Sequence, residues 1–155
     1  MKQSPLQNHL HLMKTKILIP ILIALPTLAL AGFKLPGKVF ELADLEKAKT
    51  EAVQKGKPIS ILYSDKDSSC SLCSAASETI IRELASKTIM VYVRDIATLP
   101  APAQAALQEG KYIPKVAVLN AALDQSLGLV TYEAIQADPR KAFRAVETAI
   151  RGYKK

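Results

Sequence analysis

The residues with the clearest chemical potential are Cys70 and Cys73, the only two cysteines of this 155-residue chain. They lie where a mostly apolar run, residues 59–64, gives way to a helix-like run, residues 74–86. Two cysteines three positions apart in one helical turn can bring their sulfurs within bonding reach, as a reversible disulfide requires. Free N–H groups at a helix start favour negative charge, so the pattern predicts a reactive thiolate at Cys70.

The N-terminal segment, residues 1–31, has the pattern of a signal peptide. Lys14 and Lys16 supply positive charge, residues 17–28 are largely apolar, and residues 29–31 form a small-x-small cleavage site. The apolar run is short for a membrane-spanning helix. An uncleaved N-terminal anchor is the alternative interpretation, and it would be the only membrane attachment that the sequence predicts.

Cleavage after this segment leaves residues 32–155 as one mature domain, whereas Met13 offers an alternative start that still includes a complete signal. The domain is expected to be periplasmic or secreted, in a compartment where disulfides persist. Cleavage removes three of the 21 basic residues and none of the 14 acidic ones, so the net charge falls from +7 to +4. This mild charge gives little support to nucleic-acid binding.

The chain's two histidines, His9 and His11, both belong to the predicted signal segment. The mature domain therefore lacks the histidine that catalytic triads need, and two thiolates supply only half of a zinc ligand set. We expect neither a metal site nor a bound cofactor. The remaining alternative to a working redox pair is a passive disulfide, whose loop of about four residues would stabilise the fold by roughly 2 kcal/mol.

Helix-like and strand-like patterns alternate along the mature domain. Helices are expected at residues 42–55, 74–86, 103–108 and from Pro139 onward, and strands at residues 59–64, 89–96, 115–120 and 126–132. The first two strands and the helix between them predict a parallel βαβ unit, and the last two strands predict an antiparallel hairpin.

Local signals mark how these elements begin. Residues 32–41 are expected to be an extended entry segment, and Ser68 or Ser69 is expected to cap the helix that carries the cysteines. Asp138 and Pro139 have the residue types preferred at the N-cap and first position of the last helix.

The element order, with Cys-x-x-Cys after the first central strand and Ile113-Pro114 before the hairpin, resembles that of the thioredoxin-like family. The lead-in Lys-Gly-Lys-Pro at residues 55–58 is similar to the start of exported members. The resemblance covers residues 42–153 and implies an α/β thioredoxin fold, with a central mixed sheet of about four strands flanked by helices. It also implies a cis Pro114 against the disulfide, and an Ile113 main chain that binds extended substrates.

The resemblance further implies an exported thiol-disulfide oxidoreductase in which Cys70 is the nucleophile and Cys73 resolves the mixed disulfide. No cofactor is implied, since the cysteines carry the two electrons. The partners would be cysteine-containing exported proteins and a membrane-bound redox protein that recharges the pair. The alternative is a thioredoxin-fold binding or adaptor module with a structural Cys70–Cys73 disulfide.

The chain departs from typical thioredoxins close to the cysteines. Ser69 stands where those proteins have tryptophan, and Ser71-Leu72 replaces Gly-Pro between the cysteines. Ser64 stands where a buried aspartate is typical. The direction of exchange is left open by these changes. The polar loop at residues 65–67 is expected to be solvated, and Tyr63, Tyr92 and Tyr132 are expected to fill strand positions.

Overall fold

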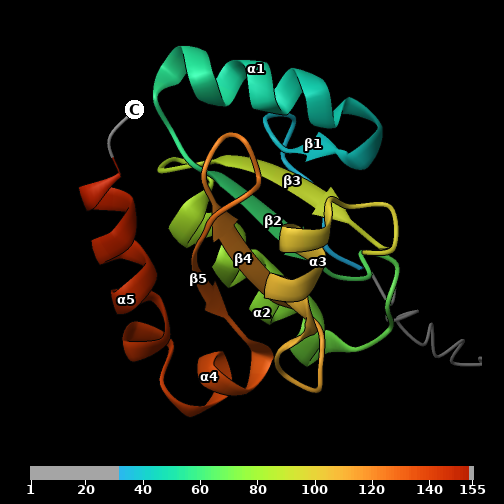
Figure 1. Cartoon of the computed structure of the whole chain (residues 1–155). Coiled ribbons are helices and arrows are strands. Elements are labelled where there is room, and N and C mark those ends of the chain that lie inside the picture. Colours follow the sequence, from blue (N-terminus) through green and yellow to red (C-terminus); the bar gives the residue numbers. More distant parts are fainter. Residues whose placement is uncertain (1–31, 154–155) are drawn as a thin grey trace, which may run out of the picture.

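The computed structural model describes residues 32–153, which form a mixed five-stranded sheet flanked by helices (Figure 1). The strand order across the sheet is β1-β3-β2-β4-β5. The predicted signal peptide, residues 1–31, lies outside the described residues, and so do residues 154–155.

The elements follow one another in an order close to the predicted one. They are β1 (Phe40–Glu41), the 3-10 helix η1 (Leu42–Asp44), α1 (Leu45–Lys55), β2 (Ile59–Tyr63), α2 (Ser71–Leu84), β3 (Ile89–Val93), α3 (Ala101–Gln108), β4 (Lys115–Leu119), β5 (Ser126–Val130), α4 (Tyr132–Ala137) and α5 (Pro139–Gly152). Asp138 caps α5 by accepting a hydrogen bond from the main-chain N–H of Lys141, and Pro139 opens that helix, so both predictions there are confirmed.

The number of strands and the end of the last strand differ from the sequence-based expectation, and β3 ends at Val93, three residues before the predicted end. The sheet has five strands instead of about four, because Phe40 and Glu41 of the entry segment pair in parallel with β3. Tyr132 opens the short helix α4 and does not extend the last strand. Thr131 ends that strand by capping α4, since its hydroxyl accepts a hydrogen bond from the N–H of Ala134 at 3.2 Å.

The strand register brings two distant segments to one end of the sheet. β2 runs parallel to β3 and antiparallel to β4, which confirms the βαβ unit, and β4 and β5 form the expected antiparallel hairpin. Tyr63 at the end of β2 pairs with Lys115 at the start of β4. The loop that leads from β2 to Cys70 and the residues just before β4, Ile113 and Pro114, therefore lie at the same sheet end.

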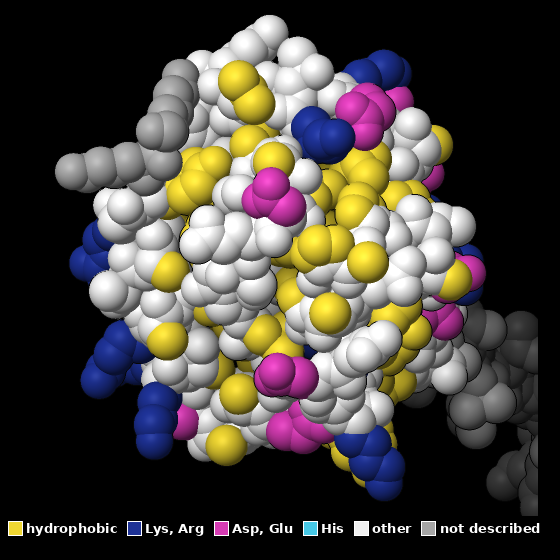
Figure 2. Space-filling model, in the orientation of Figure 1, with side chains coloured by type: hydrophobic (Ala, Val, Ile, Leu, Met, Phe, Trp, Pro, Cys, Tyr) yellow, Lys and Arg dark blue, Asp and Glu magenta, His cyan; other side chains and the backbone are white. Residues whose placement is uncertain are grey.

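Buried side chains form one hydrophobic cluster on each face of the sheet. Alternate strand residues, such as Leu62 and Val116, pack with α2, α4 and α5. Their neighbours, such as Ile61 and Ala117, pack with α1 and α3. Figure 2 shows hydrophobic side chains exposed across the middle of the face that carries α1 and α3, with Lys and Arg toward its edges.

Gly128 in β5 provides a test of how α5 packs on the sheet. It has a φ of 152°, and a Cβ added there would lie 2.9 Å from Cγ2 of Val146 on α5. We expect Gly128→Ala to lower the free energy of unfolding by about 1–3 kcal/mol, because Val146 or α5 must shift and because L side chains rarely adopt this φ. Denaturant unfolding measures this change.

The matched control is Gly37→Ala, where an added Cβ meets nothing within 4 Å. Its effect on the free energy of unfolding should stay within about 0.5 kcal/mol. Equal unfolding midpoints for the two variants would contradict the close packing of α5 against β5.

Candidate functional site

Cys70 and Cys73 form a disulfide at the start of α2, with their Cα atoms 5.2 Å apart. Cys70 is the N-cap residue, in an extended conformation, and its Sγ accepts a hydrogen bond from the N–H of Cys73 at 3.2 Å. The prediction that Ser68 or Ser69 caps the helix is therefore wrong. The sulfur takes the position that a hydroxyl oxygen would have, while Ser68 Oγ accepts a hydrogen bond from the N–H of Cys70.

This capping geometry has a direct chemical consequence. The free N–H groups of a helix start carry partial positive charge and stabilise an anion placed on them. When the disulfide is reduced, a thiolate at Cys70 occupies that position, whereas Cys73 lies one turn inside the helix. The start of α2 therefore stabilises negative charge at the position of Cys70 more than at that of Cys73.

The segment that joins the two cysteines faces solvent. Both cysteines are half-buried, but the two residues between them, Ser71 and Leu72, are exposed. Leu72 is 59% exposed, so it presents an apolar side chain to solvent between the two cysteines. An apolar contact point therefore lies next to the sulfurs.

Two buried serines lie beneath the disulfide. Ser77 Oγ donates a hydrogen bond to the carbonyl oxygen of Cys73 at 3.0 Å. Because that uses the only proton of Ser77, Ser64 must donate in the 2.8 Å hydrogen bond that joins the two hydroxyls. Ser64 thus ends a neutral chain of hydrogen bonds at the place where typical thioredoxins are expected to have an aspartate. This pair cannot act as a general base at neutral pH.

The loop before the disulfide, residues 65–69, is held by the end of β3 and by the residue after it. Arg94 Nη2 lies 2.9 Å from Oδ1 of Asp65, and Nη1 lies 2.8 Å from Oδ2 of Asp67. The main-chain N–H of Lys66 donates to the Tyr92 hydroxyl at 3.0 Å. The expectation of a merely solvated loop was therefore incomplete, because these contacts join residues far apart in the sequence.

Tyr92 lies in β3, as expected, and its ring is buried. Burial raises the pKa of its hydroxyl above that of a free tyrosine. The group stays neutral at physiological pH and can keep accepting the hydrogen bond from Lys66.

Ile113 and Pro114 lie directly before β4, at the sheet end that carries the loop to Cys70. The Ile113–Pro114 peptide bond is cis, as the resemblance implies. Pro114 is buried and Ile113 is half-buried. The edge-to-face contact between Tyr112 and Tyr132, with ring centroids 6.3 Å apart, links this segment to α4.

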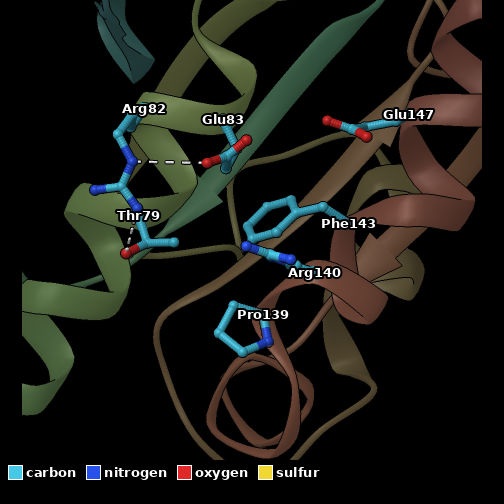
Figure 3. Close-up of a pocket in the computed structure, with 7 residues that line it drawn as sticks. All are labelled: Thr79, Arg82, Glu83, Pro139, Arg140, Phe143 and Glu147. Carbon is cyan, nitrogen blue, oxygen red and sulfur yellow. Dashed lines mark hydrogen bonds and ion pairs between the residues drawn. The ribbon is translucent and has the colours of Figure 1, made fainter.

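A separate cleft lies between α2 and α5 (Figure 3). It is lined by Thr79, Arg82, Glu83, Pro139, Arg140, Phe143 and Glu147. Arg82 pairs with Glu83, and a hydrogen bond from Lys87 lowers the pKa of Glu147. Neither cysteine lines this cleft, so its charged groups are not part of the disulfide site.

Among residues 32–153, no helix has the length and apolar character needed to cross a membrane. Within the same range, no group of three or more His, Cys, Asp and Glu side chains could hold a metal ion. No protein-family model, curated protein or solved structure matches the chain.

Arg94 gives a test of the electrostatics at the disulfide. The Arg94→Met variant leaves the carboxylates of Asp65 and Asp67 without the guanidinium group that pairs with both. These carboxylates lie within five sequence positions of Cys70. Negative charge nearby disfavours a thiolate, so we expect alkylation of reduced Cys70 at about pH 6 to slow by about two- to threefold. The effect is modest because these ion pairs are exposed.

The control is Arg144→Met, which removes the same charge from an exposed position on α5. Its alkylation rate should match that of the wild-type protein. Equal rates for the Arg94 and Arg144 variants would show that the ion pairs do not influence the sulfur.

Proposed function

We propose that this chain is an exported thiol-disulfide oxidoreductase of the thioredoxin-like family. The observation that carries the proposal is the Cys70–Cys73 disulfide at the start of α2, with Cys70 Sγ as the helix cap. The parallel βαβ unit before it and the antiparallel hairpin after Pro114 support the thioredoxin fold. The predicted signal peptide at residues 1–31 supports a periplasmic or secreted location.

The proposed chemistry uses only the two cysteines and the substrate disulfide. In the reducing direction, the Cys70 thiolate attacks one substrate sulfur, which breaks the substrate disulfide and releases its other sulfur as a thiolate. Cys73 then loses its proton and attacks Cys70 Sγ, which breaks the mixed disulfide and forms the Cys70–Cys73 bond. Two electrons pass to the substrate, and the released thiolates take up protons. Oxidation follows the same steps in reverse.

The environment supplies positioning and charge stabilisation. The N-terminus of α2 stabilises the Cys70 thiolate, both as nucleophile and as leaving group. By resemblance, the main chain of Ile113 beside Pro114 aligns an extended substrate with the sulfurs. Exposed Leu72 adds an apolar contact for a polypeptide chain. A membrane-bound redox protein would restore the starting oxidation state after each cycle.

The neutral Ser64–Ser77 pair favours a second candidate function. Without an ionisable group in that pair to help deprotonate Cys73, resolution of a mixed disulfide would be slow, and the disulfide would mainly fix the first turn of α2. The chain would then be a binding or adaptor module with the same fold.

Trapping of a mixed disulfide separates the two functions. We expect the full-length Cys73→Ala variant to accumulate a covalent complex with insulin, because Cys70 attacks and no second thiol resolves the product. The Cys70→Ala variant should form no such complex above background. Non-reducing gel electrophoresis, repeated after treatment with dithiothreitol, measures the complex.

The two variants are matched, because each keeps one of the two thiols in the same helical turn. Absence of a trapped complex in both would favour the adaptor module. Equal trapping by both would contradict the assignment of Cys70 as the nucleophile.

A further inference from the structure

Lys115 is an unusual residue for the first position of a buried strand. Only 5% of its surface is exposed. Its ammonium group donates hydrogen bonds to the carbonyl oxygens of Glu109 at 2.8 Å and Gly110 at 2.7 Å. Both residues follow the last turn of α3, where the helix dipole favours a cation. The buried ammonium group of Lys115 in β4 therefore holds the loop that follows α3.

Glu133 holds the following two residues of the same loop. It lies in the first turn of α4, and its Oε1 accepts hydrogen bonds from the main-chain N–H groups of Lys111 at 2.8 Å and Tyr112 at 3.2 Å. Hydrogen bonds from its own main-chain N–H, and then from those of Lys111 and Tyr112, lower the pKa of Glu133 below its usual range. The carboxylate is therefore ionised at neutral pH.

Close packing limits movement of the loop still further. Gly110 has a φ of +79°, and a Cβ added there would lie 2.9 Å from the Thr131 side chain and 3.3 Å from Oε2 of Glu133. Within residues 109–112, two carbonyl groups thus accept hydrogen bonds from the ammonium group of Lys115 on β4. Two N–H groups donate hydrogen bonds to the carboxylate of Glu133 on α4. These charge-assisted hydrogen bonds fix the main chain that leads directly into Ile113 and Pro114.

We propose that Lys115 and Glu133 are positioning residues that hold residues 109–112, so that Ile113 can bind the main chain of an extended polypeptide disulfide. The inference rests on the proposed function and adds the two residues that hold the substrate-binding segment in place. A small disulfide needs only to reach the half-buried sulfur of Cys70. A polypeptide must also align its backbone along the segment that the two charged residues fix.

The test compares a polypeptide with a small disulfide as substrates of the full-length protein. For Glu133→Ala, we expect the KM for insulin to rise about tenfold, because the N–H groups of Lys111 and Tyr112 lose their acceptor. The second-order rate constant for exchange with oxidised glutathione should stay within about twofold of the wild-type value. Lys115→Met should show the same split between the two substrates.

Three variants serve as controls. Glu133→Gln keeps an oxygen acceptor and should restore most of the wild-type KM for insulin. Glu109→Gln removes a negative charge, as Glu133→Ala does, and Lys111→Met removes a positive charge, as Lys115→Met does. Both substitutions lie in the same loop and leave its main-chain hydrogen bonds in place, so both variants should behave as wild type. Circular dichroism and thermal unfolding report folding, and if Lys115→Met does not fold, the Glu133 variants carry the test.

The outcomes separate this inference from the proposed function. An unchanged KM for insulin in Glu133→Ala would overturn the positioning role. An equal loss of activity toward insulin and glutathione would also overturn it, since it would indicate general damage. If the wild-type protein exchanges with neither substrate, the proposed function itself fails.

Discussion

The hydrogen bond from the N–H of Cys73 to Sγ of Cys70 is the interaction on which the site depends. It makes a sulfur atom the cap of α2, so Sγ of Cys70 has the position where a helix best stabilises negative charge. The helix itself is fixed by Ile80 and Leu84, which are fully buried against the sheet. Packing at the far end of α2 therefore determines where the sulfur lies.

The loops on either side of the disulfide depend on charged side chains from neighbouring elements. Arg94, just beyond β3, bridges two carboxylates of the loop before Cys70. Lys115 and Glu133 hold the loop before Pro114 from both sides. Short strands pair these segments at one sheet end, but the sheet alone does not fix the path of the loops. The ion pairs and charge-assisted hydrogen bonds fix the path of these loops.

Much of the fold follows from local patterns, whereas the contacts around the site do not. The parallel βαβ unit, the hairpin and the Asp138 cap were all predicted, because each rests on residues close together in the sequence. The two-residue strand β1 is too short to show a period, and a single residue, Thr131, separates α4 from the strand before it. Cysteine is not among the preferred N-cap residues, so propensity pointed to Ser68 or Ser69. The contacts of Arg94 join residues 27 or more positions apart and have no local signal.

The most direct test of a working Cys70–Cys73 pair is its reduction potential, titrated against glutathione buffers. A helix cap that stabilises the thiolate form destabilises the disulfide relative to an ordinary pair. We therefore expect a potential between about −120 and −270 mV, the range of catalytic dithiols. A value below about −300 mV would mark a structural disulfide and would contradict the proposed exchange chemistry.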